Sequence, residues 1–467
     1  MKLKNCTFKR NKFMSTLWPP AAKLENPELE KQAWTLLDQM SLEQKVGQMI
    51  QPDIRNITPR KAAEFHIGSV LSGGGSPPYD HKRASVNEWV DLADEYYDAA
   101  LSAGEPLPIA WGIDAVHGHN NLFGATLFQH NIGLGAARNP DLVREVAAAT
   151  AAEVAVTGLD WTFAPTLAVA RDARWGRTYE SYSESTSLVQ SYAGPSVEGL
   201  QGRMMEKDFL QGHHVIATAK HFLGDGGTDK GIDQGDTLCD EGTLFDIHGR
   251  PYVSAIEAGV QVIMASFSSW QGNKLHGHRY LLQEVLKDRM GFDGFVISDW
   301  NGHGQLAAAS NVSGDEAINA GIDMLMAPED WHGLLQNTLE KVRKGVIKIE
   351  RVNDAVLRIL RVKLRAGLRF PNKPSKRKMA GRAEIIGCEA HLEVARRAVR
   401  ESAVLLKNDN NLLPISKDKN IMVCGPGADN ISIQSGGWSL SWQGDGSTND
   451  DFPGSTSIFA AIKQAVD

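Results

Sequence analysis

Short apolar runs alternate with longer amphipathic stretches along most of this chain. Eight such runs, each four to seven residues long, fall between residues 46 and 326. Runs of this length are typical of buried β-strands, and the apolar spacing of three and four between them is typical of helices. The runs cover residues 46–51, 66–71, 109–113, 161–167, 215–219, 260–265, 294–297 and 322–326.

The intervening stretches complete a repeating strand–helix pattern. Helical spacing is clear at 84–103, 141–157, 281–290 and 334–344. An eightfold alternation of this kind predicts an α/β fold, a closed (β/α)8 TIM barrel, with the functional site at the carboxyl ends of its strands.

The length of the chain leaves room for a second unit. A barrel of this type needs about 250 residues or more, and the chain has 467. A stretch rich in proline and lysine breaks the periodicity after residue 370, and a helix (389–402) and a strand (420–424) are expected after it. We therefore divide the chain into an N-terminal extension (1–25), a barrel (26–370), a linker (371–388) and part of a second domain (389–467).

Composition and charge narrow the kinds of partner. The sequence is 42% hydrophobic with a formal net charge of −7, and it has no cluster of Lys and Arg. Binding to nucleic acid or to a membrane surface is therefore not expected, and no run approaches the ~18 apolar residues of a membrane helix. Residues 1–20 are basic but lack the apolar core of a signal peptide, which leaves the compartment open.

Cysteine and histidine positions do not predict a metal or a cofactor. The cysteines have no CxxC spacing, and the His-Gly-His pairs at 117–119 and 276–278 lack the i, i+4 spacing and the glutamate of a metalloprotease. The turn at 425–429 contains a proline and lacks the third glycine of a nucleotide-binding loop. The four cysteines are Cys6, Cys239, Cys388 and Cys424.

The seventh apolar run ends in Ser298, Asp299 and Trp300. A carboxylate beside an indole at the tip of a barrel strand fits a glycosidase nucleophile next to a sugar-stacking ring. The simpler interpretation is that Asp299 caps the next helix, since Asp is a favoured N-cap residue. Residues at the other strand ends decide between the two.

Polar and aromatic side chains follow several other strands. Taken singly, each has a simpler interpretation: Asp114 as a helix cap, Arg177 and Glu180 as a surface ion pair, Lys220 and His221 as a snorkelling cation and a core imidazole. Their occurrence at successive strand ends favours a pocket that binds hydroxyl groups. Asp225, Phe267 and Trp270 follow the fifth and sixth strands.

These segments resemble glycoside hydrolase family 3, in its β-glucosidase and exo-1,3/1,4-β-glucan glucohydrolase branch. The resemblance implies that Asp299 attacks the anomeric carbon of a terminal glucose and that Trp300 lines the next subsite. It also implies that the substrate is a β-linked glucan or gluco-oligosaccharide. Relatives in this branch are commonly periplasmic or secreted. The motifs lie at 112–120, 174–184, 220–222 and 298–300, and the implied glucose-binding residues are Asp114, Arg177, Lys220 and His221.

The resemblance also makes the second domain an α/β sandwich, of which this chain would hold an incomplete part. Trp442, in the run 436–444, would face Trp300 across the leaving sugar, and the glutamate that relatives use as general acid/base is expected beyond residue 467. Phe267 stands where plant relatives carry Tyr, so one hydroxyl contact is absent.

Two other functions remain open from the sequence. Without its acid/base the chain could be a catalytically silent sugar-binding fragment. A β-N-acetylglucosaminidase of the same family is less favoured, because such enzymes take their acid/base from a histidine after the Lys-His strand. Residues 222–247 contain no histidine.

Overall fold

The structure, a computed structural model, describes residues 17–466 apart from 22, 23, 25 and 308. Eight parallel strands form its centre, in the number and order that the sequence predicts. They are β1 (Ile50–Gln51), β2 (Ser69–Ser72), β3 (Ala110–Ile113), β4 (Trp161–Thr162), β5 (Thr218–Phe222), β7 (Val262–Ala265), β10 (Phe295–Ile297) and β11 (Leu325–Met326).

The strands close into a barrel. Ladders join β11 to β1, β2 to β3 to β4, and β5 to β7 to β10, all parallel. Three single parallel bridges join these groups, at Asp53–Leu71, Trp161–Ile216 and Ile297–Met324. The ring is therefore complete, and the predicted (β/α)8 barrel is confirmed.

The first predicted strand, 46–51, is too long in the sequence-based assignment. Ser41 and Gln44 form a reciprocal capping box that starts helix α2 (Leu42–Gln48), so the positions up to residue 48 are helical and only Ile50–Gln51 remain as β1. Apolar residues cannot reveal this boundary, because a buried helix end and a buried strand have similar compositions.

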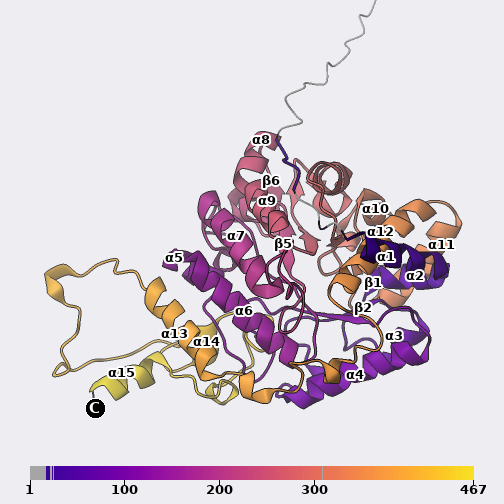
Figure 1. Ribbon diagram of the computed structural model, residues 1–467. Helices are drawn as coiled ribbons and strands as arrows, with labels where there is room; N and C mark the ends of the chain where they lie inside the picture. The colour runs from indigo at the N-terminus through magenta and orange to yellow at the C-terminus, as the bar shows by residue number, and fades with distance from the viewer. Residues whose placement is uncertain (1–16, 22–23, 25, 308, 467) are drawn as a thin grey trace, which may run out of the picture.

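Helices surround the barrel (Figure 1). The four that were predicted are observed as α4 (Val86–Ser102), α6 (Pro140–Val156), η8 (Tyr280–Arg289, wound as a π-helix) and α11 (Trp331–Arg343). The others in the ring include α3 (Pro59–Glu64), α7 (Thr186–Gln201), α9 (Arg250–Glu257), α10 (Asp315–Ala320) and α12 (Ile349–Arg365).

A small sheet lies beyond the carboxyl ends of β5 and β7. It consists of β6 (Asp236–Thr237), β8 (Ser269–Trp270) and β9 (Asn273–Lys274). This sheet therefore lies at the same end of the barrel as the predicted site residues.

The segment at 371–388, predicted as a linker, runs along the barrel. Lys373 Nζ donates to Asp98 at 2.7 Å, Arg377 pairs with Asp160, and Gly381 N donates to the carbonyl of Val156 at 2.9 Å. Helix α13 (Glu389–Ser402), at the predicted position, then packs on α5 (Asn131–Ala137) and α6 (Figure 1).

The second-domain segment contains helices and loops. Beyond α13 it forms α14 (Ile431–Ser435) and α15 (Ile458–Val466), and the connection before α14 arches away from the barrel (Figure 1). The predicted strand at 420–424 is wrong for this structure: no described segment pairs with it, and Met422 is 85% exposed. An apolar run becomes a strand only beside a partner that completes its backbone hydrogen bonds.

Most of the predicted N-terminal extension, 1–25, lies outside the described residues. Its described part includes Trp18, which is 1% exposed and packs edge-on against Phe245, with its indole N–H donating to Glu241 at 2.8 Å. This tryptophan belongs to the hydrophobic core of the barrel.

Candidate active site

The predicted site residues of the barrel gather at the carboxyl ends of its strands. Asp114 directly follows β3, Lys220 and His221 lie in β5, and Asp299 follows β10. Arg177 lies in the loop after β4 and immediately precedes the short helix η3 (Thr178–Glu180). Parallel strands bring these distant positions to one end of the barrel.

Lys220 and Asp114 form a buried ion pair. Lys220 Nζ donates to Asp114 Oδ1 at 2.9 Å, and their side chains are 2% and 12% exposed. Burial raises the pKa of Asp114, while the charge of Lys220 acts to lower it. The ammonium group of Lys220 therefore stabilises the ionised form of Asp114, which is buried and has little contact with water.

Arg177 and Glu180 form a second, bidentate pair. Arg177 Nε and Nη2 donate to the two carboxylate oxygens of Glu180 at 2.7 and 2.9 Å. Burial opposes ionisation of Glu180, but its pairing with Arg177 outweighs burial and lowers its pKa. The pair, considered from the sequence as a surface ion pair, is largely buried, with side chains 24% and 5% exposed. Arg177 Nη2 also lies 3.4 Å from His221 Nε2.

Asp299 is held by backbone contacts on both sides. Its own N–H donates to His276 Nε2 at 2.9 Å, and the N–H of Trp300 donates to its Oδ1 at 2.7 Å. Its side chain remains 13% exposed, and Oδ2 lies 3.6 Å from His221 Nε2. Burial raises the pKa of Asp299 to about 6, against the lowering effect of the nearby Arg177 charge. Near neutral pH most of this carboxyl is therefore ionised.

His221 is oriented by a second carboxyl group. Its Nδ1 lies 2.9 Å from Asp225 Oδ2. Burial, reinforced by the charge of Arg177, lowers the pKa of His221 well below its usual value, and burial raises the pKa of Asp225 to about 7. The sequence names Asp225 only as a strand-end residue; its role beside His221 becomes visible through the contact.

Trp300 and Trp442 lie against the same loop, which follows β2. A Cβ atom at Gly73 would lie 2.7 Å from Cζ3 of Trp300, and one at Gly74 would lie 2.8 Å from Cα of Trp442. The two glycines therefore allow both tryptophans to approach this loop. The Trp442 residue is 60% exposed, so its indole is available to a ligand.

Phe267 is half-buried and reaches Asp299 through another residue. Its ring centroid lies 5.8 Å from that of His276, which accepts the hydrogen bond from the Asp299 backbone. Sequence reasoning considered His276 only as a metal ligand. Burial lowers the pKa of His276 to about 3, so a neutral imidazole accepts this bond.

Trp438 is the residue of the second-domain segment that reaches the buried cluster. It is 8% exposed, and its ring lies over Lys220, with Nζ 5.4 Å from the ring centroid. A cation in this position interacts favourably with an indole face. The sequence pointed to the surrounding run, 436–444, but not to Trp438, because two tryptophans in one run cannot be ranked without their neighbours.

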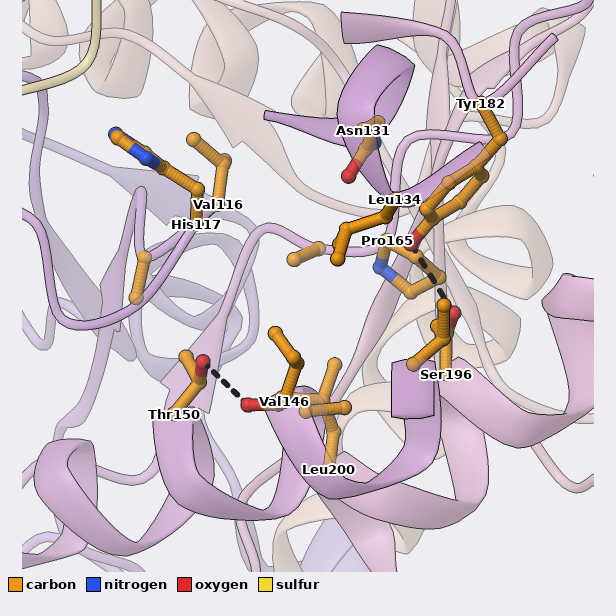
Figure 2. Close-up of a pocket in the computed structure, with 14 residues that line it drawn as sticks. Val116, His117, Asn131, Leu134, Val146, Thr150, Pro165, Tyr182, Ser196 and Leu200 are labelled. Atoms are coloured by element: carbon orange, nitrogen blue, oxygen red, sulfur yellow. Dashed lines mark hydrogen bonds between the residues drawn. The ribbon is translucent and has the colours of Figure 1, made fainter. Parts of the chain in front are cut away.

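A separate small cavity lies between the barrel wall and helices α6 and α7 (Figure 2). Its volume is about 30 Å³, and apolar side chains such as Leu134, Val146 and Leu200 line much of it. It contains none of the predicted site residues. A space of this size holds one or two water molecules and is too small for a sugar.

In the described part of the chain, no group of three or more His, Cys, Asp or Glu side chains is arranged to hold a metal ion. None of its helices combines the length and apolar character needed to cross a membrane.

A closed (β/α)8 barrel with a cluster of carboxylates and cations at its strand ends is the architecture of many glycosidase catalytic domains. Comparison with known proteins identifies the family. Residues 41–362 match the glycosyl hydrolase family 3 N-terminal domain, and residues 403–467 match the family 3 C-terminal domain. The chain belongs to glycosyl hydrolase family 3, as its motifs indicated.

Several relatives are similar over most of this chain. The lysosomal β-glucosidase of Dictyostelium discoideum is 32% identical, with 92% of this chain and 55% of the relative aligned. The periplasmic β-glucosidase of Salmonella typhimurium is 30% identical, with 92% and 54% aligned. The exo-1,3/1,4-β-glucanase of a Pseudoalteromonas species has a crystal structure that superposes with a TM-score of 0.94 at 51% identity, covering 96% of this chain and 57% of that one. The chain thus spans about half the length of these relatives.

Proposed function

We propose that this chain carries the nucleophile and glucose-binding pocket of a retaining β-glucoside hydrolase. Asp299 attacks the anomeric carbon of a non-reducing terminal glucose and forms a covalent glycosyl-enzyme. The observation that carries the proposal is the position of Asp299 at a strand end, partly exposed and beside His221 and Arg177. The names of the β-glucosidase and exo-β-glucanase relatives support the substrate class.

The buried ion pairs provide the contacts that a sugar needs. Asp114 and Glu180 offer carboxylate acceptors, while Lys220, Arg177 and His221 offer nitrogen atoms for its hydroxyl groups. Charge-assisted hydrogen bonds of this type are stronger than neutral ones, and they fix the orientation of the ring. Trp300 and Trp442 stack on the leaving sugar at the entrance.

We further propose that the general acid/base is not among the residues that the structure describes. A retaining glycosidase needs a second carboxyl group ~5–5.5 Å from the nucleophile and free to protonate the leaving oxygen. Asp114 is bound to Lys220 and Glu180 to Arg177, so neither carboxyl group is free to reach the leaving oxygen, and the pKa of Glu180 is lowered by its pairing with Arg177. Asp225 has the raised pKa of an acid, but its contact with His221 Nδ1 places the imidazole between it and Asp299.

A reactive substrate tests the proposed chemistry without the acid. Dinitrophenol leaves unprotonated, so dinitrophenyl β-glucoside requires only the nucleophile and the pocket. We expect release of dinitrophenol from the β-glucoside but not from the α-glucoside, and its loss in Asp299→Asn. The exposed Asp288→Asn serves as a matched control. Release that survives in Asp299→Asn would contradict the proposal.

A catalytically silent sugar-binding function is the second candidate. The commitment of Asp114, Glu180 and Asp225 to other side chains favours it. It predicts binding of glucose with no release of dinitrophenol, so the experiment above distinguishes the two candidates.

A further inference from the structure

Two stacked histidines attach the 436–444 loop to the barrel. His117 follows β3 and His130 precedes α5; their ring centroids lie 3.9 Å apart with an interplanar angle of 24°. His130 Nε2 lies 2.9 Å from the carbonyl oxygen of Gly437, and His117 Nε2 lies 2.6 Å from that of Trp438. Two successive carbonyl groups of the loop thus lie within hydrogen-bond distance of two neighbouring imidazoles.

The loop is held where its backbone is strained. Trp438 has a φ of 57°, in the left-handed region that a bulky side chain rarely adopts. Such a conformation is unfavourable by itself and persists only when surrounding contacts enforce it. The N–H of Trp438 donates to the carbonyl of Trp442 at 2.8 Å, and the histidines contact the carbonyls on either side of the Trp438 nitrogen and Cα.

The strained position puts the Trp438 indole over Lys220, the cation that pairs with Asp114. We propose that His117 and His130 are positioning residues: they hold Trp438 over this pair and so set the affinity of the pocket for a terminal glucose. The effect on glucose rests on the proposed function, whereas the effect on the loop does not.

The protonation state of the two histidines limits what each ring can donate. Burial lowers the pKa of His117 and lowers that of His130 to about 3, so both rings are neutral near pH 7. A neutral imidazole has one N–H. His117 faces two acceptors, since its Nδ1 also lies 2.8 Å from the carbonyl oxygen of Phe128. A neutral His117 can donate to only one of these two carbonyls at a time, and His130 places a second ring N–H within reach of the loop backbone.

Loss of one histidine should leave the rest of the segment docked. The N–H of Leu440 donates to the carbonyl of Asn120 at 2.8 Å, and Leu440 packs with Ile431 and Phe452. Arg83 pairs with Asp451 at 2.7 Å. These contacts do not involve His117 or His130, so a histidine variant changes the position of Trp438 without releasing the whole segment.

A double-mutant cycle in the full chain tests the proposal through glucose binding, measured by calorimetry. His117→Ala and Trp438→Ala should each weaken binding about tenfold, in the range of a desolvated cation–π contact. If His117 acts through Trp438, the double variant should also lose about tenfold, whereas independent effects would multiply to about a hundredfold. A hundredfold loss, or no loss in His117→Ala, would overturn the proposal.

Hydrogen exchange tests the loop itself, even if the parent chain does not bind glucose and the proposed function fails. The amide of Trp438 should exchange faster in His117→Ala and His130→Ala than in the parent, whereas the amide of Leu440, bonded to Asn120, should keep its protection. His130→Gln, which keeps an N–H donor, should restore most of the protection, and His213→Ala, at a half-buried histidine that packs on His214, should leave it unchanged. Unaltered exchange in both alanine variants would overturn the proposal.

Discussion

His221 Nε2 lies 3.6 Å from Asp299 Oδ2, although His221 lies in β5 and Asp299 follows β10, two strands that are separated in the barrel by β7. The imidazole is also fixed by Asp225 at 2.9 Å on its other nitrogen. Burial favours the neutral form of His221 and raises the pKa of Asp299 to about 6. The proposed nucleophile therefore titrates within the range where such an enzyme could work.

The first prediction concerns pH. Only the ionised carboxylate attacks, so the rate of glycosylation by dinitrophenyl β-glucoside should rise with pH around a midpoint near 6, where Asp299 loses its proton. Stopped-flow measurement of the dinitrophenol burst between pH 4.5 and 8 gives this profile. A rate that is flat across this range would mean that the Asp299 carboxyl is ionised throughout and that its burial has little effect.

The second prediction concerns stability. The pKa of the Asp299 carboxyl is 3.8 when the group is fully solvated and about 6 in the fold, so between these pH values the folded state binds more protons than the unfolded state. Its contribution to stability is fully present below pH ~4 and is lost as pH rises through about 6. Asp299→Asn avoids this loss and should be more stable than the parent by about 2–3 kcal/mol at pH 7.5.

Urea unfolding of the parent and of Asp299→Asn at pH 4 and pH 7.5 measures the difference. We expect the gain to be large at pH 7.5 and small at pH 4, with Asp288→Asn near the parent at both. If Asp299→Asn were stabilised equally at both pH values, the gain in unfolding free energy would not come from the ionisation of Asp299.

The third prediction concerns the indoles of Trp300, which is partly buried, and Trp442, which is exposed. Trp300→Ala and Trp442→Ala should each weaken binding of a longer β-glucan more than that of glucose, because stacking on an indole is worth on the order of 1 kcal/mol and acts on the second sugar. Calorimetry with laminaritriose and with glucose measures both affinities. Trp34→Ala, at another exposed indole, is the control. Equal losses for both ligands would assign the two residues to the fold instead.

The fourth prediction concerns the acid. If none of the described residues protonates the leaving oxygen, cellobiose should not be cleaved measurably, since general acid catalysis typically supplies 10²–10⁴-fold. Dinitrophenyl β-glucoside should still glycosylate Asp299, and azide, which needs no general base, should accelerate turnover. Full hydrolysis of cellobiose without an azide effect would mean that a carboxyl group in this chain, such as Asp225, acts as the acid.

The barrel could be predicted because its strands are buried on both faces, which leaves continuous apolar runs in the sequence. Their number and order were correct, and the strand-end residues Asp114, Lys220 and Asp299 are brought together as expected. Strand lengths were less accurate. At residues 46–48 the predicted strand is part of helix α2, which begins at the capping box of Ser41 and Gln44.

The second-domain segment could not be predicted as well. The run at 420–424 has the composition of a strand, but pairing depends on a neighbour that composition does not specify. Trp438 was missed for a related reason: its burial depends on His117 and on Lys220, both more than two hundred residues away in the chain. Contacts of this kind leave no periodic pattern in a single sequence.

The most direct test of the central claim is to identify the residue that becomes glycosylated. The folded chain is treated with 2-deoxy-2-fluoro-β-glucosyl fluoride, digested and analysed by mass spectrometry. We predict that the 2-fluoroglucosyl group is found on the peptide containing Asp299 and that fragmentation assigns it to this residue. A label on any other carboxylate, with Asp299 unmodified, would contradict the proposed nucleophile.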